Sequence, residues 1–183
     1  MNTPLLITLF GPAGSGKGTV GKQIAEHFAC QHVDMGDMRR EMAREHGLTL
    51  EELHERALHD RKYDDIQDAR VRGLPDEYER VFVCSRTAWF LLPQSIKVLL
   101  TCRPEISAER VAKRQGISPD EALRLNAERD IQDGDRYRRY VGIPSYPPTK
   151  EQFDVVVDSS DIDPDTVLAK LIEGIQKVIE QRG

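Results

Sequence analysis

The residues best suited to chemistry lie in a glycine-rich segment near the N-terminus. The segment reads Gly11-Pro12-Ala13-Gly14-Ser15-Gly16-Lys17-Gly18-Thr19 and contains the spacing G-x-x-x-x-G-K. In such a loop the glycines let backbone N–H groups point inward at phosphate oxygens, and the lysine reaches the β- and γ-phosphates of a nucleotide. The N-terminus of a following helix adds a partial positive charge. We therefore predict that all residues of this loop bind ATP and that Lys17 acts in catalysis.

The residue after the lysine bears on how a metal ion is held. Many loops of this kind carry a serine or threonine there, and its hydroxyl binds Mg²⁺. This chain has Gly18 at that position and Thr19 one residue later. We therefore expect the Mg²⁺ that accompanies ATP to rest mainly on phosphates and water, and we assign no metal-ligating side chain in the protein.

Arginines at particular positions form the second group of candidates. Phosphoryl transfer between two phosphates brings several negative charges together, and the planar guanidinium group binds phosphate at two points. Arg86 directly follows the apolar run at 81–84, and Arg40 lies seven residues past the short pair His32-Val33. Ligands of open α/β sheets bind beyond the carboxyl ends of the strands, so both arginines stand where a ligand is expected.

Two helical faces carry further arginines. Arg110 and Arg114 are four residues apart, which places them on one face of the helix expected after residue 104. Arg129, Asp133 and Arg136 follow the spacing i, i+4, i+7 on the next helix, again on one face. We predict that Asp133 orients the two arginines beside it.

Strand-like and helix-like segments alternate along the chain. Short apolar runs at 5–10, 81–84, 96–101 and 153–157 predict buried strands, and a further strand is expected at 32–33. Helix-start signals stand between them: they are Thr49, Pro104, Ser118 and Asp163. This alternation predicts an α/β fold of three layers, with a five-stranded parallel sheet and helices on both faces. A length of 183 residues favours a single domain.

Composition narrows the class of protein. The chain has 26 basic and 31 acidic residues, a net charge of −5, which argues against nucleic acid or an anionic membrane as its main partner. No apolar run approaches the ~20 residues of a transmembrane helix, and the N-terminus lacks the basic region of a signal peptide. Three cysteines, Cys30, Cys84 and Cys102, show no metal-ligand spacing, so we expect buried thiols in a reducing cytoplasm.

With these motifs in place, the chain resembles the nucleoside monophosphate kinases, and among them the short, archaeal-type cytidylate kinases. The ending Gly16-Lys17-Gly18-Thr19 is similar to that of adenylate kinase and its relatives. The runs at 34–40 and 83–86 resemble the start of the monophosphate-binding region and the strand-end arginine motif. The run at 102–114 resembles the approach to the lid, and the Arg129, Asp133 and Arg136 spacing matches the lid of cytidylate kinases. The resemblance covers nearly the whole chain.

The resemblance implies a P-loop kinase domain over 1–183, with a helical monophosphate-binding region at about 34–75 and a lid at about 114–137. It implies transfer of a phosphoryl group from ATP to CMP or dCMP by a monomer. The residues that it implies for the acceptor are Asp37, Arg40, Asp64, Arg86, Arg129, Asp133 and Arg136. Arg110 and Arg114 are implied near ATP, and Arg86, Arg129 and Arg136 join Lys17 in catalysis.

Departures from the family pattern leave alternatives open. Cys84 and Ser85 stand where the family usually has a carboxylate and a glycine, and Met35 stands where it tends to have a small residue. The alternatives are a kinase of another acceptor (AMP, UMP or a small metabolite) and an adenylate-kinase-like ATPase that serves as an assembly factor. The second usually needs a carboxylate at the strand end, where Cys84 stands.

Several other polar and aromatic residues are assigned mainly structural places. Asp60, Asp64 and Asp68 are four residues apart, which predicts three carboxylates on one helix face, either solvated or near the acceptor nucleoside. Trp89 and Phe90 are expected in the core. The histidines are expected at the surface; they are His27, His32, His46, His54 and His59.

Overall fold

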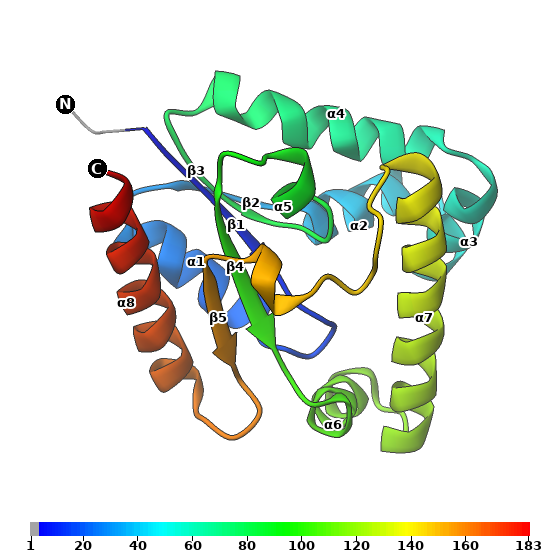
Figure 1. The fold of residues 1–183 in the computed structure, drawn as a ribbon. Coiled ribbons are helices and arrows are strands. Elements are labelled where there is room, and N and C mark those ends of the chain that lie inside the picture. Colours follow the sequence, from blue (N-terminus) through cyan, green and yellow to red (C-terminus); the bar gives the residue numbers. More distant parts are fainter. Residues whose placement is uncertain (1–3) are drawn as a thin grey trace.

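The computed structural model of the protein describes residues 4–183 (Figure 1). Within that range one sheet of five strands has the order β2-β3-β1-β4-β5, and every pairing is parallel. The strands are β1 (Leu5–Phe10), β2 (Gln31–Asp34), β3 (Arg80–Cys84), β4 (Ile96–Thr101) and β5 (Val155–Asp158). The predicted five-stranded parallel sheet is confirmed.

Helices fill the segments between the strands. They are α1 (Lys17–His27), α2 (Met35–Glu45), α3 (Leu50–His59), α4 (Lys62–Glu77), α5 (Ala88–Leu91), α6 (Pro104–Gln115), α7 (Pro119–Tyr140), the 3₁₀ turn η1 (Lys150–Gln152) and α8 (Pro164–Arg182). Three expected start signals act as caps: the side chains of Thr49, Ser118 and Asp163 accept backbone N–H groups of α3, α7 and α8. These caps satisfy donors that the first helical turn leaves free.

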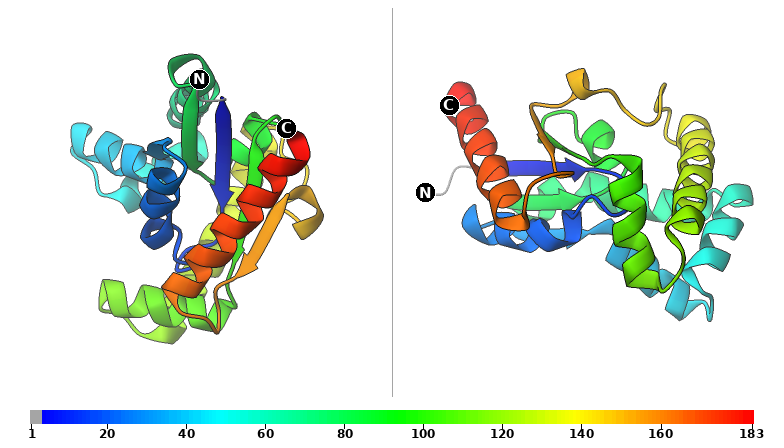
Figure 2. Two further views of the ribbon diagram at one scale, coloured as in Figure 1. Left: turned by 90° about the vertical axis from the view of Figure 1, so that its left-hand side faces the viewer. Right: turned by 90° about the horizontal axis from the view of Figure 1, so that it is seen from below.

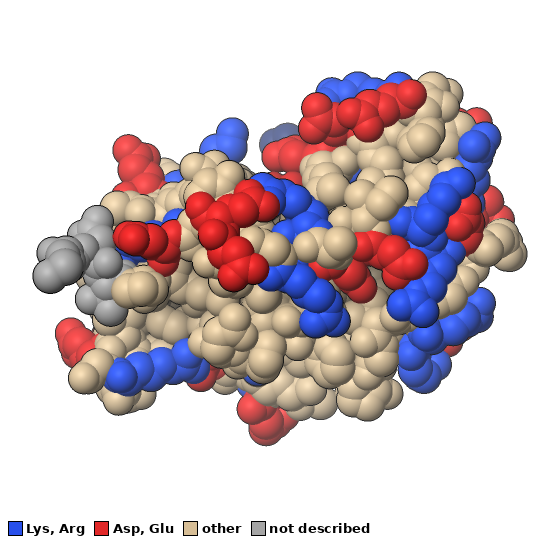
Figure 3. Space-filling model, turned by 90° about the horizontal axis from the view of Figure 1, so that it is seen from above, with Lys and Arg blue, Asp and Glu red and all other residues tan. Residues whose placement is uncertain are grey.

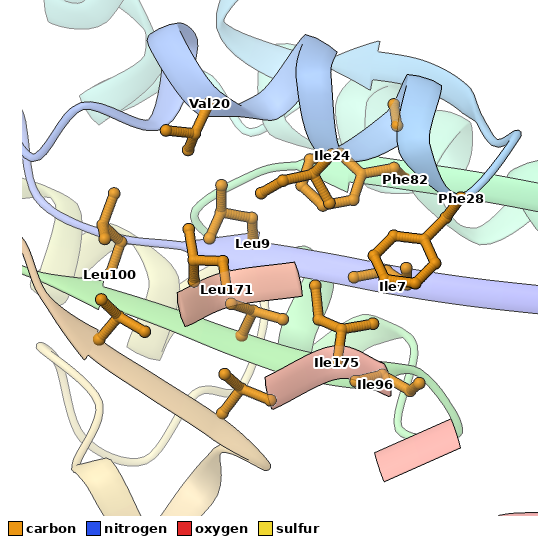
Figure 4. Close-up of a cluster of buried hydrophobic side chains, with 14 of the residues drawn as sticks. Ile7, Leu9, Val20, Ile24, Phe28, Phe82, Ile96, Leu100, Leu171 and Ile175 are labelled. Carbon is orange, nitrogen blue, oxygen red and sulfur yellow. The ribbon is translucent and has the colours of Figure 1, made fainter. Parts of the chain in front are cut away.

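The sheet is buried on both faces. Side chains of Ile7 and Leu9 on one face pack against Ile24 of α1 and Leu171 of α8, and all four are fully buried (Figure 4). On the other face, the β3 side chains pack among residues of α4 and α5. Because successive strand residues alternate between faces, Phe82 and Cys84 turn toward α1 while their neighbours turn toward α4.

The carboxyl ends of the strands gather at one end of the molecule. Asp34, the last residue of β2, pairs with Cys84, the last residue of β3, and Cys84 also pairs with Leu9 of β1. Figure 2 shows β1 pointing toward the end of the molecule at which α6 and α7 lie, and these two helices pack side by side. Polar groups that follow the strands are thereby brought toward α7.

Two expectations about local structure are wrong. The last strand begins at Val155 because Phe153 turns aside into an aromatic cluster, with ring centroids 6.0 Å from Phe10 and 5.4 Å from Trp89. Asp60 shares no helix with Asp64, because α3 ends at His59 and α4 begins at Lys62. The Asp60 carboxylate instead accepts the backbone N–H of Lys62 at 3.1 Å.

The expectation of three buried thiols is only partly right. Cys84 is buried, whereas Cys30 and Cys102 are half-buried. Cys84 is the last residue of β3, which lies between β2 and β1 and whose last four residues are all buried.

The outer surface carries both signs of charge. Figure 3 shows acidic and basic side chains interspersed over the face seen from above, with several basic groups toward the end that holds α3 and α7. Among residues 4–183, no helix combines the length and apolarity needed to cross a membrane.

Candidate active site

A cavity of about 370 Å³ lies beyond the carboxyl ends of β1, β2 and β3. The glycine-rich loop borders it, as do α2, α4 and α7. The predicted site residues that line it are Ala13, Gly14, Gly16, Lys17, Gly18, Thr19, Arg40, Asp64, Arg86, Arg114, Arg129 and Arg136. The other predicted residues, which do not line it, are Gly11, Pro12, Ser15, Asp37, Arg110 and Asp133.

The glycine-rich loop packs too tightly for side chains at two of its glycines. A Cβ atom at Gly11 would lie 2.5 Å from the carbonyl oxygen of Leu100, and one at Gly14 would lie 2.5 Å from that of Ser107. Gly14 and Gly16 also have positive φ values of 71° and 95°, which glycine adopts without strain. Gly16 caps α1, so the loop leads directly into a helix N-terminus, where anions bind.

Lys17 folds over this loop. Its Nζ atom donates to the carbonyl oxygens of Gly11 at 2.5 Å and Pro12 at 2.6 Å. Burial, together with the positive charge of Arg86, lowers the pKa of Lys17 to about 7. The negative charge of a bound polyphosphate would stabilise the protonated, charged form of Lys17.

Arg110 of α6 contacts the backbone of the loop. Its Nη1 atom lies 3.3 Å from the carbonyl oxygen of Gly14, and its Nη2 atom donates to Ser159 O at 2.7 Å. Ser107, on the same helix, donates its hydroxyl to Ala13 O at 2.5 Å. Arg110 therefore ties the loop to the segment after β5, and Arg114 is the one of this pair that reaches the cavity.

Asp133 stands at the centre of the arginine cluster. Its Oδ2 atom accepts from Arg86 Nη1 at 2.6 Å, and its Oδ1 atom accepts from Arg136 Nη2 at 2.6 Å. Arg129 Nε is 3.7 Å from Oδ2. Burial by itself would raise the pKa of Asp133, but the charges of Arg86, Arg136 and Arg129 hold it below its usual range. The expected pairing of Asp133 with arginines on its own helix is present, and Arg86, two residues past the end of β3, joins it.

Two further groups tie the cluster to other elements. Arg86 Nη1 also donates to Asp130 Oδ1 at 3.0 Å and to the hydroxyl of Tyr146 at 2.8 Å. Arg136 Nε lies 3.3 Å from Asp64 Oδ2, and both side chains are almost completely buried. Asp64 is therefore no part of a solvated acidic face. The cluster links β3, α4, α7 and the loop that contains Tyr146.

Arg39 also lines the cavity, and the sequence analysis selected only its neighbour Arg40. Arg39 is buried, and its Nη1 atom donates to Asp64 Oδ1 at 3.0 Å and to the side-chain oxygen of Gln67. Among the described residues, its Nε and Nη2 atoms have no hydrogen-bond partner although they are buried. Arg40 is exposed and pairs with Asp37 at 2.5 Å. Arg39 occupies a position in the buried stripe of α2, and that spacing was the available signal.

Two histidines contradict the expectation of surface positions. His54 is half-buried in the cavity wall, with Nε2 3.5 Å from Arg129 Nη2. Burial, together with the positive charge of Arg129, lowers the pKa of His54 to about 3. His32 is half-buried beside Cys84. His27, His46 and His59 are exposed, as expected.

The family of the chain follows from comparison with known proteins. The model of the cytidylate kinase-like family matches residues 6–161. The chain belongs to this family. It is 36% identical to the cytidylate kinase of Pyrococcus horikoshii over 165 residues, which cover 90% of this chain and 85% of that protein. It is 33% identical to the cytidylate kinase of Pyrococcus abyssi over 177 residues, 97% of each chain.

Solved structures support the fold of this family member. The shikimate kinase of Bacteroides thetaiotaomicron superposes with a TM-score of 0.62 at 16% identity, covering 96% of this chain and 98% of that one. A gluconokinase from Sinorhizobium meliloti superposes with a TM-score of 0.61 at 16% identity, covering 99% and 97%. The three-layer P-loop kinase fold expected from the sequence is thereby confirmed.

Proposed function

We propose that this protein transfers the γ-phosphoryl group of ATP to CMP or dCMP, giving ADP and CDP or dCDP. Its membership of the cytidylate kinase-like family and its named relatives support a phosphotransferase of this kind. The observation that carries the proposal is the cavity itself. The phosphate loop with Lys17 borders the same cavity as Arg86, Arg129 and Arg136, so one space offers sites for two phosphate groups.

The donor nucleotide is assigned to the loop. Backbone N–H groups at the start of α1 and the Lys17 ammonium would hold its phosphates. Mg²⁺, when bound, would neutralise charge on the phosphates of ATP. The residues present fit such an ion, because Thr19 offers a hydroxyl oxygen at the cavity and Mg²⁺ retains several waters. Gly18 has no side chain to add, so the phosphates and water would supply most ligands.

The acceptor phosphate is assigned to the arginines. Arg40 and Arg86 would hold it, while Arg129 and Arg136 would face the transferring group. The attacking phosphate oxygen is already ionised, so the reaction needs positioning and charge stabilisation rather than a general base. Asp133 and Asp64 would keep Arg86 and Arg136 in place, and Asp37 would do the same for exposed Arg40.

The acceptor base is assigned to the wall formed by α2 and α4. Arg39 presents buried N–H groups that have no hydrogen-bond partner among residues 4–183, and the carboxylate of Asp68 also lines the cavity. Cytosine offers two acceptors, O2 and N3, beside an amino donor, whereas the N3 of uracil is a donor. A guanidinium and a carboxylate that line the same cavity would therefore suit cytosine better than uracil.

The elements divide into regions under this proposal. Within one P-loop kinase domain spanning 1–183, residues of about 34–75, which contain α2, α3 and most of α4, would form the monophosphate-binding region. Residues of about 114–137, largely α7, would form a lid that closes over the phosphates and keeps water out. From the family resemblance we propose a monomer, and with two small-molecule substrates we propose that it acts in the cytoplasm without nucleic acid or membrane partners.

One assay tests the reaction. ADP release is measured with Mg²⁺–ATP and, in turn, CMP, dCMP, UMP, AMP or no acceptor. Turnover with CMP or dCMP far above the others supports the proposal. Preference for another acceptor would show that CMP and dCMP are not the substrates. Release of ADP without any monophosphate would favour an ATPase that acts as an assembly factor.

A further inference from the structure

Three metal-binding atoms of different kinds meet beside the phosphate loop. They are a ring nitrogen of His32, a carboxylate oxygen of Asp34 and the Sγ atom of Cys84, and all lie within 4.8 Å of one another. His32 and Asp34 come from β2 and Cys84 from the end of β3. Sequence spacing gives no sign of this group, because the parallel pairing of β2 and β3 joins residues about 50 positions apart.

The separation of the donor atoms is close to that of a tetrahedral site. Cys84 Sγ and His32 Nε2 are 3.8 Å apart. Zinc binds sulfur at about 2.3 Å and nitrogen at about 2.0 Å, so the two donors of a tetrahedral site lie about 3.5 Å apart. Small side-chain rotations would bring these atoms to that distance. The imidazole of His32 lies parallel to the Phe82 ring at 6.1 Å between centroids, which limits the orientations of the imidazole.

The carboxylate of Asp34 has an oxygen available for a cation. Its Oδ1 atom accepts both cap bonds of α2, from Gly36 N at 2.7 Å and Asp37 N at 3.3 Å. These bonds fix the carboxylate, and within residues 4–183 no hydrogen bond is described for its Oδ2 atom. Both Asp34 and Cys84 line the cavity, so an ion can reach them from solvent.

The neighbouring helix leaves space at the two remaining donors because residue 21 is a glycine. A Cβ atom at Gly21 would lie 3.0 Å from Cys84 Sγ and 3.1 Å from His32 Nε2. Gly21 lies in the middle of α1, where glycine costs about 1 kcal/mol relative to alanine. Its φ is not in the left-handed region, so the backbone conformation does not require glycine there. The close approach to the two donors gives the reason for a glycine.

We propose that His32, Asp34 and Cys84 form a binding site for a divalent cation of the zinc class, with water as the fourth ligand. Thiolate and imidazole ligands select zinc-like ions over Mg²⁺, so this site differs from that of the Mg²⁺ carried by ATP. Binding would replace the thiol proton of Cys84, which passes to solvent, and His32 would bind through Nε2 in its neutral form. The site lies beside the phosphate loop but does not depend on which nucleotide the protein uses.

Cobalt(II) is the probe that tests the site. The reduced, metal-free protein is titrated with Co²⁺, and absorption is followed in the near ultraviolet, where thiolate-to-cobalt charge transfer occurs, and in the visible. We expect one Co²⁺ per chain with a charge-transfer band, displaced by one equivalent of Zn²⁺ and retained in excess Mg²⁺. Cys84→Ser should abolish the band, while Cys30→Ser and Cys102→Ser, which alter thiols elsewhere, should keep it.

Two more variants separate ligation from folding. His32→Gln keeps the thiolate and should weaken Co²⁺ binding more than about tenfold. Gly21→Ala keeps all three ligands and should also weaken binding, with circular dichroism confirming the fold. Absence of the charge-transfer band in the wild type would overturn the proposal. So would a band that persists in Cys84→Ser, or unchanged affinity in both His32→Gln and Gly21→Ala.

Discussion

The Oδ2 atom of Asp133 lies 2.6 Å from Nη1 of Arg86, and this ion pair joins α7 to the end of β3. The two residues are 47 positions apart, and both side chains are largely shielded from solvent. Arg136 binds the other oxygen of the same carboxylate. One aspartate thus balances the charge of arginines from two elements that both border the cavity.

Asp133→Ala is expected to destabilise the whole fold. Removing one partner of a buried ion pair costs about 3–5 kcal/mol, because it leaves uncompensated charge behind. Here Arg86 and Arg136 would both lose a carboxylate partner. A loss of this size lowers the melting temperature of a domain of this length by about 6–20 °C. Asp135→Ala, on the same helix but in an exposed pair with Arg138, is the control and should melt like wild type. Equal melting temperatures for the two variants would contradict the central role of Asp133.

Arg129→Ala is expected to lower kcat more than about tenfold and to change the KM for ATP little. The side chain of Arg129 is 40% exposed, although its Nε atom is buried. Its contact with Asp133 is the longest in the cluster. Of the three arginines around Asp133, it is therefore the one freest to turn toward a transferring phosphoryl group. Arg129→Lys should not restore kcat, since an ammonium lacks the two-point guanidinium contact. Steady-state kinetics measures both variants.

A neighbouring arginine provides the control for Arg129. Arg124 lies on the same helix and forms an exposed pair with Glu128. Arg124→Ala should retain the wild-type kcat. If Arg129→Ala also stays within a factor of about three of wild type, Arg129 has no part in the transition state.

The sequence predicted the fold well because its signals are local. Apolar runs, caps and the glycine-rich loop depend on neighbouring residues, and four of the five expected strands closely match those observed. The sequence analysis placed Asp60 on one helix with Asp64 and Asp68, because these aspartates keep the i, i+4 spacing. The structure has a break between two helices at 60–61, which this spacing does not reveal. The error at Phe153 arose because a tertiary aromatic cluster, rather than local pattern, decides where that residue lies.

The candidate site was less predictable because its contacts are long-range. Arg39 meets Asp64 across 25 positions and His54 meets Arg129 across 75, and no spacing rule relates such residues. A weaker local signal did exist for Arg39. The buried stripe of α2 consists of Met35, Arg39, Met42 and Ala43. A charged residue at such an inward position indicates that its guanidinium has buried partners.

Arg39→Gln is expected to reduce the preference for CMP over UMP. The variant removes the unpaired N–H groups that we assign to the cytosine ring. A lost hydrogen bond to a charged group corresponds to about 1.5–3 kcal/mol, so the KM for CMP should rise at least about tenfold, with the KM for ATP unchanged. Arg44→Gln alters an exposed arginine of the same helix and should leave both values alone. An unaltered ratio of CMP to UMP turnover in Arg39→Gln would remove Arg39 from base recognition.

ATP binding is expected to take up a proton at mildly alkaline pH. The pKa of Lys17 is about 7 in the nucleotide-free protein, chiefly through burial, so at pH 8 its amine is mostly neutral. The phosphates of ATP favour the charged ammonium and raise this pKa toward its ordinary value near 10.5. Binding therefore captures close to one proton at about pH 8, and affinity falls as pH rises from about 7 toward 10. Below pH 7 the lysine is already protonated, and this dependence disappears.

Calorimetry measures that proton directly. Titrations of ATP at pH 8 in two buffers with different ionisation enthalpies give the number of protons taken up per nucleotide bound. Lys17→Arg keeps a permanent positive charge, so its ATP binding should show no uptake from this position. Lys17→Ala should lose activity while circular dichroism stays normal, because the hydrogen bonds described for this side chain within residues 4–183 all go to the loop. Equal proton uptake by wild type and Lys17→Arg would show that another group titrates and that Lys17 is charged in the free protein.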